Sequence, residues 1–146
     1  KPITLEGITI DSCPLSHPQG SLAFRFKENN KTVVFMTDNE LSLDENSKGA
    51  INKFTEFCKD ADVLIHDSQY APEEYIKYEG FGHSHYELSI QLAHKANVKK
   101  LLLFHHDPTR TDEQLENILQ SLKCKLFHLN LLKLFVQLIF VPPISN

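Results

Sequence analysis

The stretch at residues 98–110, VKKLLLFHHDPTR, decides the fold class. Its central LLLF run is wholly apolar, which is typical of a β-strand covered on both faces, and two histidines and an aspartate follow directly. Residues 63–67, VLIHD, repeat this pattern, because another short apolar run ends there in His66 and Asp67. Both stretches predict strands inside a sheet, each with polar groups at its carboxyl end.

Strand and helix patterns alternate in the sequence around these two stretches. Alternating β-branched residues predict three more strands, at residues 3–12, 21–26 and 32–37. The apolar spacing predicts a helix over residues 48–59, and capping-box patterns predict helices that begin at Ser84 and Thr111. Strands that alternate with helices indicate an α/β protein whose helices pack against a sheet.

The composition is that of one globular domain with no general affinity for nucleic acid. The chain has 146 residues, of which 41% are hydrophobic and 23% charged, and its formal net charge is −4. A negative protein binds nucleic acid only through a local basic patch. The longest basic cluster holds three lysines within residues 95–100, and a solvated helix end explains it.

The cysteines and the first residues indicate a cytoplasmic setting. Cys13, Cys58 and Cys124 are odd in number and lack the C-x-x-C spacing, which favours three buried thiols in a reducing cytosol. The sequence begins at Lys1 without a methionine or an apolar leader, so we expect an internal start and no signal peptide.

Polar clusters stand at the ends of four predicted elements: His17 before a strand, Asp38 after one, and the groups that begin at His66 and His105. Neighbouring strands lie only about 5 Å apart, so residues at their ends converge on one edge of a sheet. Imidazole and carboxylate are ligands for zinc, manganese and iron. Taken singly each cluster is weak evidence, since a lone histidine is more often a surface residue and Asp38 suits a turn.

In their order, these clusters resemble the later motifs of the metallo-β-lactamase superfamily, especially its tRNA 3′-processing endonucleases and phosphonate-pathway cyclic phosphodiesterases. The resemblance rests on PLSHPQGSLAFRF, KTVVFMTDNE, ADVLIHDSQY, GFGHSHYE and VKKLLLFHHDPTR. It implies an α/β fold that is the C-terminal half of an αββα four-layer sandwich. Residues 1–121 would form this part of the domain, and residues 122–146 an apolar tail.

The tail allows two interpretations. Its leucine, isoleucine and phenylalanine residues are interrupted by polar residues too often for a membrane span. A buried strand near residues 134–141 accounts for it, and so does a sequence that has departed from the pattern of its family. We expect no membrane partner.

The resemblance also implies roles for five residues. His17, Asp38 and His105 would be metal ligands, with Asp38 bridging two divalent ions of zinc or manganese and the adjacent His106 a less favoured alternative to His105. His83 would assist the departing oxygen, and Asp67 would orient His83, although a capping or turn carboxylate explains Asp67 equally well. In the implied mechanism the two ions activate a water molecule and clamp the phosphate oxygens during hydrolysis.

The sequence departs from the family in one decisive feature. The first and strongest family motif, His-x-His-x-Asp-His, is absent from these 146 residues. Each metal then keeps one or two protein ligands, whereas a bound divalent ion normally needs three or more. We therefore expect the chain by itself to bind metal poorly and to be inactive.

These features predict a metal-dependent hydrolase of a small phosphodiester, of which this chain is a part. Residues 66–69 read HDSQ where the tRNA-processing branch has His-Glu-Ala-Thr, so nucleic acid is not favoured as a substrate. A thioester or lactone hydrolase and a non-catalytic truncated remnant stay open as alternatives. Half of a sandwich leaves one sheet face uncovered, which predicts poor solubility or a homodimer.

Overall fold

The computed structural model describes residues 1–128 and 135–138. Its sheet contains seven strands in chain order: β1 Ile3–Leu5, β2 Ile8–Pro14, β3 Leu22–Glu28, β4 Lys31–Met36, β5 Val63–Asp67, β6 Lys100–Phe104 and β7 Phe135–Leu138. The described helices are α1 Ile51–Cys58, α2 Pro72–Tyr75, α3 Tyr86–Lys95 and α4 Asp112–His128. The predicted α/β class is confirmed.

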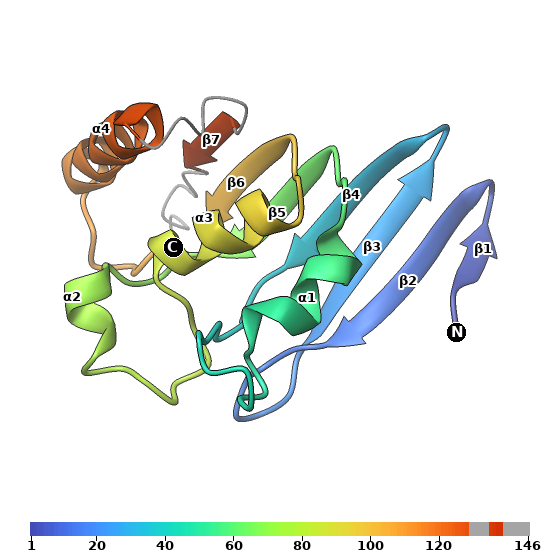
Figure 1. Ribbon diagram of the computed structural model, residues 1–146, viewed down its shortest axis with the longest axis horizontal. Helices are drawn as coiled ribbons and strands as arrows, with labels where there is room; N and C mark the ends of the chain where they lie inside the picture. Colours follow the sequence, from blue (N-terminus) through green and yellow to red (C-terminus); the bar gives the residue numbers. More distant parts are fainter. Residues whose placement is uncertain (129–134, 139–146) are drawn as a thin grey trace, which may run out of the picture.

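The sheet has an antiparallel half and a parallel half (Figure 1). Strands β1 to β4 pair as antiparallel neighbours, whereas β4 to β7 pair in parallel. Parallel neighbours need a long crossover, and the helices supply it at each step. The carboxyl ends of β4, β5 and β6 therefore meet at one edge of the sheet.

The first predicted strand is two strands. Glu6 and Gly7 both adopt positive φ angles, 49° and 85°, which is the geometry of a two-residue hairpin turn. The chain reverses there, so β1 and β2 pair with each other. The alternation of residues 3–12 continues through the turn, so the sequence pattern did not indicate that the chain reverses there.

The core lies between the sheet and the helices on one of its faces (Figure 1). Alternation along β4, β5 and β6 points Val34, Leu64 and Leu101 toward α1 and α3, and all three are completely buried. The helices contribute buried side chains that include Ile51, Phe54, Cys58, Leu88 and Leu92. Each large apolar side chain buried here contributes about 1.5–3 kcal/mol.

The opposite face of the sheet is apolar and partly exposed. We call it the open face and define it by Phe24, Phe35, Ile65, Leu102 and Phe104. Phe24 is 38% exposed and Phe35 37%. Ile65 and Leu102 are only partly buried, so the expectation that β5 and β6 are covered on both faces is correct for one face alone.

The C-terminal segment continues the fold beyond residue 121. Helix α4 runs through that position to His128, and Leu122 in it is 1% exposed. The strand interpretation of the tail is confirmed over Phe135–Leu138, which pairs with β6, while 129–134 and 139–146 lie outside the described residues. The division into residues 1–121 and 122–146 stays a prediction. None of the helices in the described part is long and apolar enough to cross a membrane.

The cysteines differ from the expectation of three buried thiols. Cys58 in α1 is buried, but Cys13 is half-buried and Cys124 is exposed. Cys124 lies on α4, on a turn that faces solvent, and the sequence pattern did not separate that face from the buried one.

Candidate metal centre

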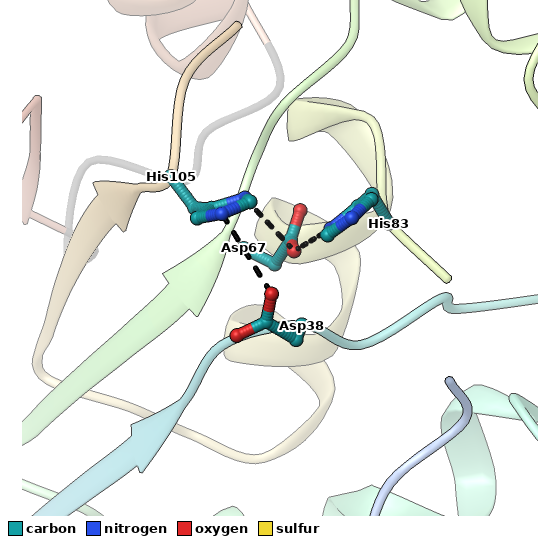
Figure 2. Close-up of side chains that lie close together, drawn as sticks. All are labelled: Asp38, Asp67, His83 and His105. Atoms are coloured by element: carbon teal, nitrogen blue, oxygen red, sulfur yellow. Dashed lines mark hydrogen bonds and ion pairs between the residues drawn. The ribbon is translucent and has the colours of Figure 1, made fainter. Parts of the chain in front are cut away.

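Asp38, Asp67, His83 and His105 come together at the carboxyl edge of the parallel strands (Figure 2). Each offers one ligand atom, and these atoms all lie within 4.8 Å of one another. Asp38 follows β4, Asp67 ends β5 and His105 follows β6, so the parallel pairing of these strands places three of the four. His83 comes from the loop before α3.

Asp67 binds His83 directly. Asp67 is completely buried, and its Oδ2 accepts a hydrogen bond from His83 Nδ1 at 2.7 Å. Its Oδ1 accepts hydrogen bonds from the backbone N–H groups of Ser84 at 3.1 Å and Gln69 at 3.3 Å. The bond from Asp67 raises the pKa of His83 above its ordinary value of 6.5, because it stabilises the protonated ring more than burial opposes it.

His105 faces both carboxylates without closing a hydrogen bond to either. Its Nε2 lies 3.7 Å from Asp38 Oδ1, and its Nδ1 lies 3.6 Å from Asp67 Oδ2. The ring stacks on His83 with centroids 4.8 Å apart. His105 Nδ1 is buried and has no hydrogen-bond partner among the described residues. A buried polar atom of this kind needs an explanation, and two carboxylates with two imidazoles fit a divalent cation.

Two of these residues adopt a left-handed backbone. Asp38 has φ 54° and His105 has φ 56°. This conformation is uncommon outside glycine, and it persists only where neighbouring contacts fix it, which happens most often at functional sites. Ser21 Oγ donates to the Asp38 carbonyl at 2.7 Å, and Thr37 Oγ1 donates to Asp38 Oδ2 at 3.1 Å. These contacts direct the second carboxylate oxygen toward His105.

His17 lies beside this cluster. Its ring packs edge-on against His83, with centroids 5.5 Å apart, and its Nδ1 accepts a hydrogen bond from Gln19 N at 3.3 Å. Nε2 is then the nitrogen left for a metal. His17 is not among the four residues whose ligand atoms lie within 4.8 Å of one another. The predicted roles of His17 and of the four clustered residues stay predictions.

Gly82 permits the close approach of His17 to the loop before α3. Gly82 has φ 94°, and a Cβ there would overlap the His17 ring and lie 2.6 Å from Pro18 Cδ. We expect Gly82→Ala to lower the free energy of unfolding by more than about 1 kcal/mol and to shift the His17 ring resonances. Urea unfolding and NMR measure these effects.

Gly80→Ala is the matched control for that change. Gly80 has φ 89°, but no atom lies within 4 Å of a Cβ built there. It therefore carries the same backbone strain without the overlap. Equal loss of stability in the two variants would show that contact with His17 contributes nothing.

Behind the cluster lies a buried polar network that sequence reasoning missed. Asn39 Oδ1 accepts a hydrogen bond from Ser16 N at 3.0 Å, and Asn39 Nδ2 lies 3.2 Å from His66 Nε2. His66 Nδ1 lies 2.7 Å from the Asp67 carbonyl and 3.0 Å from Ser89 Oγ. The network ties the ends of β4 and β5 to α3, so it fixes the residues that carry Asp38 and Asp67.

Ser84 belongs to this network, and its predicted role as a helix cap is wrong. Ser84 Oγ accepts a hydrogen bond from Leu41 N at 2.9 Å and donates to the Asn39 carbonyl. Helix α3 begins later, with His85 at the N-cap and no side-chain capping bond. The other predicted capping box is confirmed, since Gln114 N donates to Thr111 Oγ1 at 3.3 Å and Thr111 N to Gln114 Oε1 at 2.9 Å.

The buried His66 makes the fold sensitive to acid. Burial lowers the pKa of His66 below its ordinary value of 6.5. Just below pH 6.5 this histidine is therefore protonated in the unfolded chain and still neutral in the folded chain. The contribution to stability is present above pH 6.5 and is lost as the pH falls toward the lowered pKa. We expect the free energy of unfolding to fall by up to about 1.4 kcal/mol for each pH unit below 6.5.

Urea unfolding between pH 7.5 and pH 5 measures this loss. His66→Gln removes one titrating group and should make the acid loss shallower; burial also lowers the pKa values of His85 and His106, which account for the remainder. His94→Gln, at an exposed position of α3, should leave the pH dependence unchanged. A steep acid loss that survives in His66→Gln would assign the effect to other groups.

The sheet order and the cluster at its carboxyl edge define the class of protein, and solved structures agree with it. The metallo-β-lactamase fold protein YhfI of Bacillus subtilis superposes with a TM-score of 0.67 at 22% identity, over 83% of this chain and 45% of that one. The short form of human tRNase Z superposes with a TM-score of 0.59 at 21% identity, over 71% and 38%. The chain has the metallo-β-lactamase fold, as expected.

Sequence comparison confirms the resemblance within that fold. The chain is 42% identical to ribonuclease Z of Sulfurisphaera tokodaii over 74 residues, which are 50% of this chain and 24% of that protein. It is 37% identical to ribonuclease Z of Staphylococcus haemolyticus over 66 residues, 45% of this chain and 22% of that protein. No protein-family model matches. Over the matched part the chain is similar to ribonuclease Z, and it spans about a quarter of the length of these relatives.

Proposed function

We propose that the chain carries part of the active site of a metal-dependent hydrolase that cleaves phosphodiester bonds. The observation that carries the proposal is the convergence of Asp38, Asp67, His83 and His105 within 4.8 Å at one edge of a metallo-β-lactamase fold. Two divalent ions, zinc or manganese, would supply an activated water and neutralise charge on the phosphate. Further ligands would come from a segment with the His-x-His-x-Asp-His motif.

Five residues of this chain would have separate roles in the proposed reaction. Asp38, His105 and His17 would hold the metals. His83 would give a proton to the departing oxygen, and its hydrogen bond to Asp67, which raises its pKa, favours the protonated ring that this role needs. Asp67 would keep the ring of His83 oriented through the 2.7 Å bond. We keep a cytoplasmic location as part of the proposal, on the odd number of cysteines and the absence of C-x-x-C spacing.

The test is metal-dependent hydrolysis of bis-p-nitrophenyl phosphate. The 146-residue chain is compared with a longer version that includes a His-x-His-x-Asp-His segment, each with manganese or zinc. Activity in the longer version alone would support a split ligand set. No activity in either, on this substrate or on RNA, would refute phosphodiester hydrolysis and favour a thioester or lactone substrate or a non-catalytic remnant.

RNA is a second candidate substrate. The relatives that match this sequence are ribonucleases, which favours an RNA phosphodiester over the small molecule first expected. The net charge of −4 opposes RNA binding by this chain alone. Cleavage of an RNA with a 3′ extension by the longer version, at a higher kcat/KM than bis-p-nitrophenyl phosphate, would decide for RNA.

The open face supports the predicted homodimer. Phe35 and Phe104 on it lie with ring centroids 6.3 Å apart, and Phe24 extends the apolar surface onto β3. We expect the chain to run as a dimer in light scattering, because pairing of two such faces removes apolar area from water. Phe35→Glu should give a monomer, and Leu43→Glu, at an exposed loop position, should not. A monomeric parent chain would contradict the prediction.

A further inference from the structure

The segment from Ile76 to Gly82, in the connection between α2 and α3, exposes large apolar side chains and directly precedes His83 of the candidate metal centre. We call it the aromatic loop. It extends outward from the sheet (Figure 1), and Ile76 is 80% exposed, Phe81 60% and Tyr78 38%. His83 follows directly, so the Cα atoms of Phe81 and His83 lie within about 7.6 Å of each other. Exposed apolar groups gathered in this way mark a contact site.

Glu40 fixes the backbone of the aromatic loop. Its Oε1 accepts hydrogen bonds from Gly80 N and from the Tyr75 hydroxyl, both at 2.7 Å, and its Oε2 accepts one from Gly82 N at 2.9 Å. Glu40 lies two residues after Asp38, so the loop is tied to the same strand end that carries a candidate ligand. A loop held in place before binding loses less conformational entropy when a ligand arrives.

The rings around the loop form a continuous set. Tyr78 stacks on the buried Tyr70, with centroids 4.7 Å apart and planes 5° from parallel, and Tyr70 meets His83 edge-on at 6.3 Å. Phe81 stands at 88° to Tyr78, with centroids 5.9 Å apart. Tyr70 covers one face of Tyr78, whereas Phe81 is 60% exposed, so a further flat ring can stack on Phe81 or meet it edge-on, and both arrangements are favourable.

We infer that the aromatic loop binds a planar aromatic group of the substrate, next to the phosphodiester presented to Asp38, His83 and His105. This inference rests on the proposed function and adds to it a feature that selects the substrate. A nucleobase and a non-nucleotide aryl group share the required chemistry. Stacking of one such ring on an aromatic side chain contributes about 1–3 kcal/mol.

The experiment follows the fluorescence of 2-aminopurine riboside 5′-monophosphate, which is quenched when its base stacks. The chain has no tryptophan, so the probe is excited without interference. We expect saturable quenching by the 146-residue chain, and Phe81→Leu, which keeps an apolar side chain without a ring, should weaken binding at least about fivefold. Phe81→Tyr should retain binding, and Phe24→Leu on the open face is the matched control that should bind as the parent does.

Competition identifies the ring. Displacement by p-nitrophenyl phosphate as strong as by adenosine monophosphate assigns the loop to any aryl group, and displacement by the nucleotide alone assigns it to a nucleobase. Any one of three results would overturn the inference. The first is displacement of the probe by ribose 5-phosphate as strong as by the nucleotide, the second is unchanged probe binding in Phe81→Leu, and the third is the absence of quenching.

Manganese binding, measured by calorimetry on the longer, His-x-His-x-Asp-His-containing version of each variant, separates this inference from the proposed function. Asp38→Asn should lose manganese and keep the probe, and Phe81→Leu should do the reverse. Probe binding that depends on Phe81 in a longer version without manganese affinity would keep the loop site and refute the proposed metal site.

Discussion

Replacing Asp38 by asparagine is expected to lower metal-dependent hydrolysis by the longer, His-x-His-x-Asp-His-containing protein at least about a hundredfold. Loss of a group that merely supports a ligand costs 10- to 100-fold in metal affinity or activity, and loss of a ligand should exceed that. Asparagine is the informative replacement, because it tolerates the left-handed backbone at φ 54° and keeps the shape of the side chain. The variant therefore removes the negative charge without adding backbone strain.

The measurement is kcat/KM for bis-p-nitrophenyl phosphate together with manganese affinity. Glu45→Gln, which neutralises an exposed carboxylate on the loop after β4, should leave both unchanged. If Asp38→Asn keeps its manganese affinity and loses only activity, Asp38 acts on the reaction without holding the metal. If it keeps both, the candidate centre is not the active site.

The sequence was sufficient to locate the strand ends. Apolar runs that stop at a polar pair mark the carboxyl end of a strand: β6 ends one residue before His105, and β5 ends at Asp67, with the buried His66 and Asp67 as its last two residues. Three of the four clustered residues lie at such ends. Their order along the chain then placed them on adjacent strands, since parallel neighbours are joined by helices.

The network behind the cluster could not be predicted, because its contacts join residues far apart in the sequence. The Ser84 hydroxyl accepts from Leu41 N, 43 residues away, and this contact replaces the local capping bond that the pattern favoured. Asn39 and His66 lie 27 residues apart and meet only after β4 and β5 pair. Local sequence patterns identify residues that can cap a helix or bind a metal. Tertiary contacts decide which of these roles each residue takes.

The two interpretations of Asp67 illustrate the same limit. A turn carboxylate should accept backbone N–H groups, and it does so from Gln69 and Ser84. A partner of His83 should reach its ring, and the other oxygen does this at 2.7 Å. The alternatives were not exclusive, because one carboxylate has two oxygens and each has lone pairs to spare.

Replacing Asp67 by asparagine should lower the free energy of unfolding by about 2 kcal/mol at pH 6. The amide oxygen can still accept from the backbone N–H groups, but the amide nitrogen that then faces His83 cannot accept from a protonated ring. A hydrogen bond to a charged group is worth about 1.5–3 kcal/mol. The raised pKa of His83 should fall to or below its ordinary value of 6.5 in the variant, which NMR titration of the ring measures.

The pH dependence distinguishes this bond from a general loss of packing. The raised pKa means that the contribution of the charged pair is complete below pH 6.5 and is lost as the pH rises through the pKa of the folded state. The difference in stability between parent and Asp67→Asn should therefore shrink from pH 6 to pH 9. Asp11→Asn, which breaks the half-exposed pair with Arg25, should cost less than about 1 kcal/mol. If the stability difference between the parent and Asp67→Asn does not change with pH, His83 is neutral in the folded protein. It could then not act as the proton donor that we propose.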